Sequence, residues 1–144
     1  ETVGRRLRRD GARVEVVAIG IRFYDLTYVS HQQVLLSPTN ITKELSEAAC
    51  KLFDELWDGT PIRHFGVHTG RVSREGNNRQ LSLFDTTDYE RLEKLDKAVD
   101  SIRERFGMDS VQRASFLNQD KVDHMNGGVS REKRTVDYRK EKVM

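Results

Sequence analysis

The feature that most constrains the fold is a strict alternation of apolar residues with small or polar ones near the start of the chain. The apolar set is Val17, Ile19, Ile21 and Phe23, and the intervening set is Ala18, Gly20, Arg22 and Tyr24. Successive side chains of a strand point to opposite faces, so this period of two predicts a strand within residues 12–26 that has one apolar face. Residues 27–36 have a similar character and complete an expected antiparallel hairpin.

Helical and strand patterns surround this hairpin. Residues 1–9 read as the end of a helix that stops at Asp10-Gly11, and residues 41–58 carry apolar residues at helical spacing before Asp58-Gly59. We expect the 37–40 segment to break the second strand, Thr42 to cap the helix, and residues 61–72 to form a third strand interrupted by Gly66. The predicted class is α+β, an antiparallel sheet with helices packed on one face.

A polar, turn-rich stretch at residues 73–79 marks the expected domain boundary. Beyond it, apolar residues recur at a 3, 4, 3, 4 spacing and predict an amphipathic helix over 88–107, capped by Thr87 or Asp88, whose stripe covers the domain or a partner. The stripe is Leu92, Leu95, Val99, Ile102 and Phe106. We therefore divide the chain into a domain at 1–74, a linker at 75–87, the helix at 88–107 and a basic, largely flexible tail at 108–144.

Composition excludes several classes of protein. No run approaches the roughly 20 apolar residues of a membrane span, the first residues have no apolar signal region, and the single Cys50 has no disulfide partner within the chain. We therefore expect a soluble intracellular protein without a membrane partner. The 25 basic and 23 acidic residues are unevenly placed, with four basic against one acidic in 59–84 and nine acidic against six basic in 85–120. Such segregation suits a protein that meets a polyanion with one face, although chance variation in a highly charged chain is an alternative.

The sequence gives no sign of catalytic chemistry. It contains no phosphate-binding glycine loop and no nucleophile elbow, and it offers no convincing carboxylate pair. His64 and His68 are four residues apart, which on a strand separates them by about 13 Å, too far to share a metal ion. We expect no catalytic residue, no metal site and no cofactor in this chain.

A polar sheet face is the first candidate site. If the apolar set of the first strand packs on a helix, Arg22 and Tyr24 point the other way, and in the third strand His64 and His68 follow, with Arg63 beside them. Gly20 and Gly66 on this face would let a large partner approach the backbone, and the cationic and hydrogen-bonding residues suit phosphate oxygens. An ordinary solvated sheet face is the alternative.

The second candidate site is the string Gln80, Leu81, Ser82, Leu83 and Phe84, which stands in a polar stretch just after the domain end. Its apolar residues have no obvious core to enter, so a pocket on another protein is their expected destination. Alternatively, Leu83 and Phe84 fold back onto the domain or onto the helix at 88–106.

Taken together, these blocks resemble a known family. The matching segments are residues 7–26, 36–40, 48–59 and 61–67. They resemble the C-terminal little finger, or polymerase-associated, domain of Y-family translesion DNA polymerases, above all the bacterial polymerase IV and V type, the ImpB/MucB/SamB group. Residues 80–84 match the Q-L-x-L-F motif with which such polymerases bind the sliding clamp. Residues 112–117 and 130–134 resemble the ends of Gram-positive members.

The resemblance implies a βαββαβ domain, of which the first strand is absent from this chain, with duplex template-primer DNA bound on the open face through phosphates. It implies that the catalytic palm, with its carboxylates and Mg²⁺, lies upstream, so that this chain is a non-catalytic part of a DNA-directed DNA polymerase of the cytoplasm, associated with the nucleoid. Gly20 stands where members often have a basic residue, and His64 and His68 where they often have arginine. The competing hypothesis is an α+β protein-interaction module that presents a docking peptide and binds no DNA.

Overall fold

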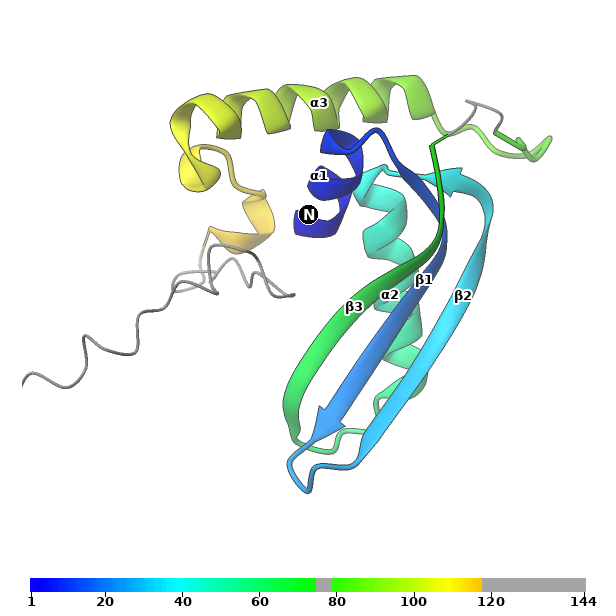
Figure 1. Ribbon diagram of the computed structural model, residues 1–144, viewed down its shortest axis with the longest axis vertical. Helices are drawn as coiled ribbons and strands as arrows, with labels where there is room; N and C mark the ends of the chain where they lie inside the picture. Colours follow the sequence, from blue (N-terminus) through cyan, green and yellow to red (C-terminus); the bar gives the residue numbers. More distant parts are fainter. Residues whose placement is uncertain (75–78, 118–144) are drawn as a thin grey trace, which may run out of the picture.

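Three antiparallel strands form the sheet of the computed structural model, which describes residues 1–74 and 79–117. The central strand is β1 (Arg13–Phe23), flanked by β2 (Tyr28–Thr39) and β3 (Ile62–Ser73), in the order β2-β1-β3. The helices are α1 (Thr2–Arg9), α2 (Thr42–Leu56) and α3 (Tyr89–Phe106), followed by the short 3₁₀ turns η1 (Met108–Ser110) and η2 (Ala114–Phe116). In Figure 1, α2 lies behind the sheet and α3 runs across its upper end, above α1. This is the predicted α+β arrangement.

The apolar alternation in β1 builds the core, as predicted. Val17, Ile19 and Ile21 are fully buried, and they cluster with Leu45 and Leu52 of α2. Burying such side chains stabilises a fold by about 1.5–3 kcal/mol each relative to leaving them in water. One face of the sheet is thereby covered, and the other stays open.

Three local predictions around α2 and β3 were wrong. β2 continues through Pro38 to Thr39. It is an edge strand, and an edge strand tolerates a proline, which lacks a backbone N–H, on the side that has no neighbouring strand. Thr42 is the first residue of α2 and not its cap, and its backbone N–H donates to the Asp96 carboxylate of α3 at 2.7 Å. Gly66 does not interrupt β3, since it pairs directly with Gly20.

The predicted helix over 88–107 is present, and Asp88 caps it by accepting from the backbone N–H of Arg91 at 3.0 Å. Its apolar stripe is only partly covered: Leu92 and Val99 are half-buried, whereas Leu95 and Phe106 are 58% and 69% exposed. The closest contact with α1 is made by an ionic face one residue over. Arg8 of α1 donates to Asp96 at 3.0 Å and to Asp100 at 2.6 Å.

The remaining expectations concern the tail. Predictions for residues 118–144, including the flexible basic end and the 130–134 segment, lie outside the described residues, as does the 75–78 part of the linker. None of the described helices is long and apolar enough to cross a bilayer.

Candidate nucleic-acid interface

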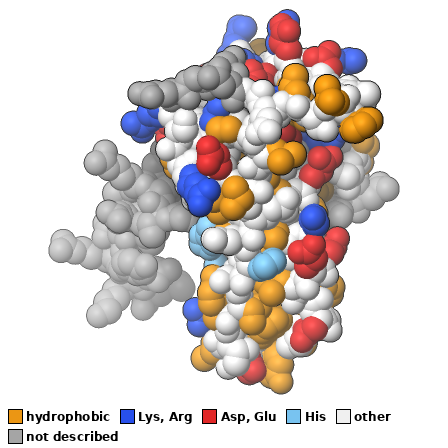
Figure 2. Space-filling view, turned by 90° about the vertical axis from the view of Figure 1, so that its right-hand side faces the viewer, with side chains coloured by type: hydrophobic (Ala, Val, Ile, Leu, Met, Phe, Trp, Pro, Cys, Tyr) orange, Lys and Arg blue, Asp and Glu red, His pale blue; other side chains and the backbone are white. Residues whose placement is uncertain are grey.

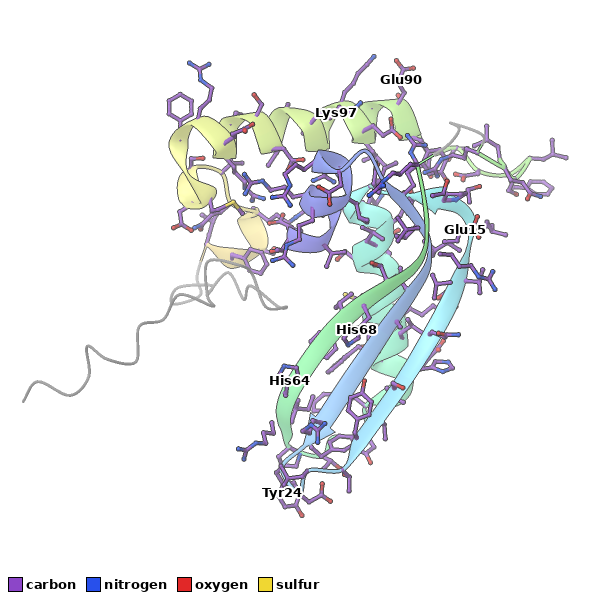
Figure 3. All side chains as sticks on the ribbon, in the orientation of Figure 1. Glu15, Tyr24, His64, His68, Glu90 and Lys97 are labelled. Carbon is purple, nitrogen blue, oxygen red and sulfur yellow. The ribbon has the colours of Figure 1, made fainter. Side chains whose placement is uncertain are left out.

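The open face of the sheet is built from the side of β1 that does not enter the core. Gly20 pairs with Gly66, Arg22 pairs with His64, and Ala18 pairs with His68 across the β1–β3 ladder. Paired residues of neighbouring strands point to the same side, so this register sets both histidines beside Arg22 and around two adjacent glycines. Figure 3 shows His64 and His68 on β3.

A shallow, open depression occupies the middle of this face. Its lining consists of Gly20, Arg22, Tyr28, His64, Gly66 and His68. Three of the five residues predicted to contact DNA, Arg22, His64 and His68, therefore lie together. Gly20 and Gly66, which have no side chains, lie at its floor.

The other two predicted residues lie apart from the depression. Tyr24 follows the end of β1 at the lower tip of the sheet (Figure 3), where its backbone N–H donates to the Pro61 carbonyl at 3.0 Å. Arg63 falls at a register shift, between the Arg22–His64 and Phe23–Ile62 pairs, so it is not part of the regular alternation. The space-filling view shows apolar side chains gathered at this lower end (Figure 2).

The two histidines approach each other more closely than the strand spacing suggests. A β-carbon at position 66 would lie 3.3 Å from Nε2 of His68 and 3.8 Å from Cε1 of His64, so both rings lean over Gly66. The side chains therefore bring the two imidazoles closer together than the backbone spacing alone would. Within residues 1–74 and 79–117, no three His, Cys, Asp or Glu side chains gather as a metal would require.

Positive charge dominates the depression, since no carboxylate is among its lining residues. The nearest turn contains Asp25, whose carboxylate accepts from the hydroxyl and the backbone N–H of Thr27. These two hydrogen bonds, the hydroxyl's first, lower the pKa of Asp25. Tyr28 is the lining residue that the sequence did not single out, although its pairing with Arg22 follows from the hairpin register.

The second candidate site, residues 80–84, forms an exposed loop beside the upper end of the sheet. Leu83 and Phe84 are 99% and 93% exposed, and Leu81 is 63% exposed. The alternative in which Leu83 and Phe84 fold back onto the domain or onto the helix is therefore wrong. We call Gln80–Phe84 the QLSLF loop.

Side chains of the domain hold the near end of this loop. The buried Ser37 hydroxyl accepts from the Gln80 backbone N–H at 2.8 Å and donates to the Gln80 carbonyl at 3.1 Å. Arg79 donates two hydrogen bonds of 2.7 Å to Glu44 of α2, and its guanidinium lies 3.6 Å from the centre of the Tyr89 ring. The hydrogen bonds to Glu44 are the main cause that raises the pKa of Arg79.

The far end of the loop is joined to the start of α3. Asp85 closes a turn through its backbone N–H, which donates to the Ser82 carbonyl at 3.0 Å. Its carboxylate accepts from the Tyr89 hydroxyl and from the Thr87 backbone N–H. The loop is therefore fastened on both sides, and its apolar tip is exposed to solvent.

Comparison with known proteins identifies this architecture. The family model of the impB/mucB/samB family C-terminal domain matches residues 1–83, more than half of the chain. The chain belongs to the impB/mucB/samB C-terminal domain family. The match contains the whole sheet, α1 and α2, and most of the QLSLF loop.

Curated relatives of this impB/mucB/samB domain extend the similarity beyond the sheet. The chain is 33% identical over 120 residues to DNA polymerase IV of Clostridium acetobutylicum, which covers 83% of this chain and 30% of the relative. It is 36% identical to DNA polymerase IV 2 of Bacillus subtilis over 120 residues (81% and 28%) and 36% identical to DNA polymerase IV of Acetivibrio thermocellus over 119 residues (81% and 30%). The chain spans about a third or less of the length of these relatives.

Proposed function

We propose that this chain is the non-catalytic C-terminal part of an error-prone translesion DNA polymerase. In this proposal it holds template-primer DNA by its backbone phosphates and docks on the sliding clamp. The observation that carries the proposal is the open depression in which Arg22, His64 and His68 surround two glycines without a carboxylate. Membership of the impB/mucB/samB family and similarity to bacterial DNA polymerase IV support it. Such a protein would act at the nucleoid.

The sheet face suits phosphates for a simple physical reason. Arg22 carries a positive charge and donates hydrogen bonds, and each histidine ring offers a further N–H donor. The glycines at 20 and 66 have no side chains of their own, and this leaves room close to the sheet for the side chains that line the face. Contacts of this kind carry no base information, so we expect weak binding of all duplex sequences, with a Kd of about 10⁻⁴ to 10⁻⁶ M at physiological salt.

Fluorescence anisotropy with a labelled duplex tests this assignment. Arg22→Ala with His64→Ala should weaken binding of every duplex alike. The matched control is Lys51→Ala with His31→Ala, which removes one basic residue and one histidine from the helix-covered side, where His31 lies 3.9 Å from Glu55. Equal loss in both double variants would mean that charge alone, and not this face, binds the DNA.

Salt separates this proposal from the competing interaction module. If three phosphates are neutralised, affinity for the duplex should fall about 40-fold between 50 and 200 mM salt. Docking of an apolar peptide responds little to salt over this range. A chain that binds the clamp but shows no duplex binding at 50 mM salt would favour the module.

The QLSLF loop supports the clamp part of the proposal. Leu83 and Phe84 are adjacent apolar anchors at the exposed tip, with Leu81 as a third contact and the Gln80 amide available for polar groups at a pocket rim. We expect micromolar affinity, which lets a polymerase exchange on the clamp, with tethering to shared DNA raising the effective concentration.

Calorimetry with a purified bacterial sliding clamp measures this interaction. Leu83→Ala with Phe84→Ala should abolish heat release while leaving Tm unchanged, because both side chains are already in solvent. Leu36→Ala, at a side chain 83% exposed on β2, is the control and should bind as the parent does. Clamp binding that survives the double substitution would remove the loop from the proposal.

The polymerase reaction itself belongs, in this proposal, to polypeptide outside this chain. The described residues offer no set of carboxylates that fits Mg²⁺. We therefore derive no catalytic step from them.

A further inference from the structure

Tyr28 lies across a neighbouring strand. A β-carbon at Gly20 would overlap the Tyr28 hydroxyl and lie 2.8 Å from Cζ and 2.9 Å from Cε2 of the ring. The direct strand partner of Gly20 is Ser30, so Tyr28 reaches Gly20 diagonally, and its ring must lie along the sheet to do so. Tyr28 is 52% exposed, which leaves much of the ring in contact with solvent.

The same arrangement occurs at the adjacent glycine. His64 and His68 both lean over Gly66, which is the direct partner of Gly20, and both histidines are exposed. Three aromatic rings from two outer strands therefore cover two neighbouring glycines of the open face. We call Tyr28, His64 and His68 the aromatic platform.

A single cation accompanies these rings within the depression. The Arg22 guanidinium carbon lies 5.5 Å from the centre of the Tyr28 ring, within the range of a cation–π contact, and one Arg22 nitrogen also donates to the Leu26 carbonyl at 3.3 Å. No carboxylate lines the depression. The surface therefore combines aromatic rings with positive charge.

Two simpler explanations account for part of this surface only. An aromatic ring over a glycine stabilises a sheet by covering its bare backbone, which explains Tyr28 but not two further rings over the next glycine. Phosphate binding explains Arg22 and the histidines, but it does not explain Tyr28, because an anionic phosphate is not attracted to the electron-rich face of an aromatic ring. Stacking of bases uses all four residues, since every base has a π face and its flanking phosphate needs a cation.

We propose that the aromatic platform binds unpaired bases of single-stranded DNA by stacking, with Arg22 at a flanking phosphate. This inference rests on the proposed function, because it uses the same face, and it adds a preference that phosphate contacts alone would not produce. Stacking is tolerant of sequence, so the preference is for unpaired bases as such.

The experiment compares three labelled probes with the full 144-residue chain at fixed salt. They are a 12-nucleotide thymidine oligomer, an abasic oligomer of equal length, and a duplex. The abasic oligomer has the same phosphates without the bases. Each stacked base should raise affinity for the thymidine oligomer about fivefold or more over the abasic one.

Substitutions locate the effect. Tyr28→Leu should reduce the preference for the thymidine oligomer about fivefold while leaving abasic and duplex binding in place, whereas Tyr28→Phe should keep the preference, since the ring remains. Gly20→Ala displaces the ring by a different route, through its added methyl group, and should have the same effect without removing the tyrosine. Phe106→Leu, at an aromatic side chain 69% exposed at the end of α3, is the control and should change nothing. Tm values verify that each variant is folded.

The outcomes separate the two proposals. If the parent chain binds thymidine and abasic oligomers equally but still binds duplex, the stacking inference is wrong and the proposed function stands. If none of the three probes binds, both are wrong. A preference that survives both Tyr28→Leu and Gly20→Ala would also overturn the platform.

Discussion

Two helices pack in this molecule by opposite means. α2 covers the sheet with apolar side chains, of which Leu52 is only 1% exposed, whereas α3 joins α1 through largely buried charges and leaves Leu95 and Phe106 of its apolar stripe exposed. Apolar burial is not directional, and it fixes the sheet and α2 as one core. The ionic contact is directional: Arg8 donates to Asp96 and Asp100 and also to the Asn40 carbonyl and the Thr42 hydroxyl.

The difference shows that α3 is attached to the domain by a few specific groups and is not part of its core. Charged groups lose hydration when they are buried. This ionic seam, the contact of Arg8 with Asp96 and Asp100, therefore contributes less to the free energy of unfolding than its number of contacts suggests. If α3 leaves, its charges regain water, and the sheet with α2 keeps its own core. We expect α3 to open at a smaller free-energy cost than the sheet.

The largest expected effect comes from breaking the apolar side of the comparison. Leu52→Ala removes a fully buried side chain between α2 and the sheet and should lower the free energy of unfolding by about 2–5 kcal/mol. Urea denaturation measures this loss, and the whole described domain should unfold together. A loss below about 1 kcal/mol would mean that α2 is not part of the core.

Breaking the ionic side should have a smaller and more local effect. Arg8→Met removes the central cation and should cost about 1–3 kcal/mol, limited by the release of α3 into solvent. Hydrogen exchange should then speed up in α3 while the β1 amides remain protected. Equal loss of protection in both regions would contradict the separation of the two packing modes.

Much of this fold was predictable because local patterns decided it. The period of two in β1 and the helical spacing in α2 each place a continuous apolar face, and burial followed both. The face of α3 was not predictable in this way. Its spacing correctly shows where the apolar stripe is, but which face packs depends on Arg8, 88 residues before Asp96, and no local pattern contains that pairing.

The candidate site followed the same rule. Arg22, His64 and His68 were predictable because strand alternation and pairing bring them together. Tyr28 over Gly20 was missed, since a diagonal reach depends on a side-chain conformation that the alternation does not give. Ser37 and Arg79, which fasten the QLSLF loop, were missed because their partners Gln80 and Glu44 are distant in sequence.

A finer test compares two carboxylates of the same seam. Asp96 accepts from Arg8 and also from the backbone N–H of Thr42 at the start of α2, whereas Asp100 accepts two hydrogen bonds from Arg8. Asp96→Ala should therefore cost about 1 kcal/mol more than Asp100→Ala, the usual value of a lost helix cap. Thermal unfolding of the two single variants gives the difference, and equal Tm values would deny Asp96 this capping role.

The smallest effect concerns the junction between the QLSLF loop and α3. Hydrogen bonds from Tyr89 and then Thr87 hold the pKa of Asp85 below its ordinary value of 3.8. Folding lowers the pKa of this carboxyl, so its ionised form stabilises the turn at any pH above the pKa of the unfolded chain. The stabilisation is lost as the pH falls through the lower pKa of the folded chain. The Thr87 amide signal should therefore titrate below pH 3.8, and Asp85→Asn should remove that titration. A midpoint at or above 3.8 would contradict these bonds.

Fastening the QLSLF loop at both ends has a consequence for geometry. When a docking peptide is joined to its domain by a long flexible linker, a partner that binds the peptide fixes the position of the domain but not its orientation, because the domain can still rotate freely. Here Ser37, Arg79 and Asp85 join the loop to β2, α2 and α3, so a partner holding Leu83 and Phe84 would also constrain the angle of the sheet. The open face would then take a narrow range of orientations relative to the partner. Substitutions at Arg79 would change this orientation before they changed the affinity of the loop for the partner.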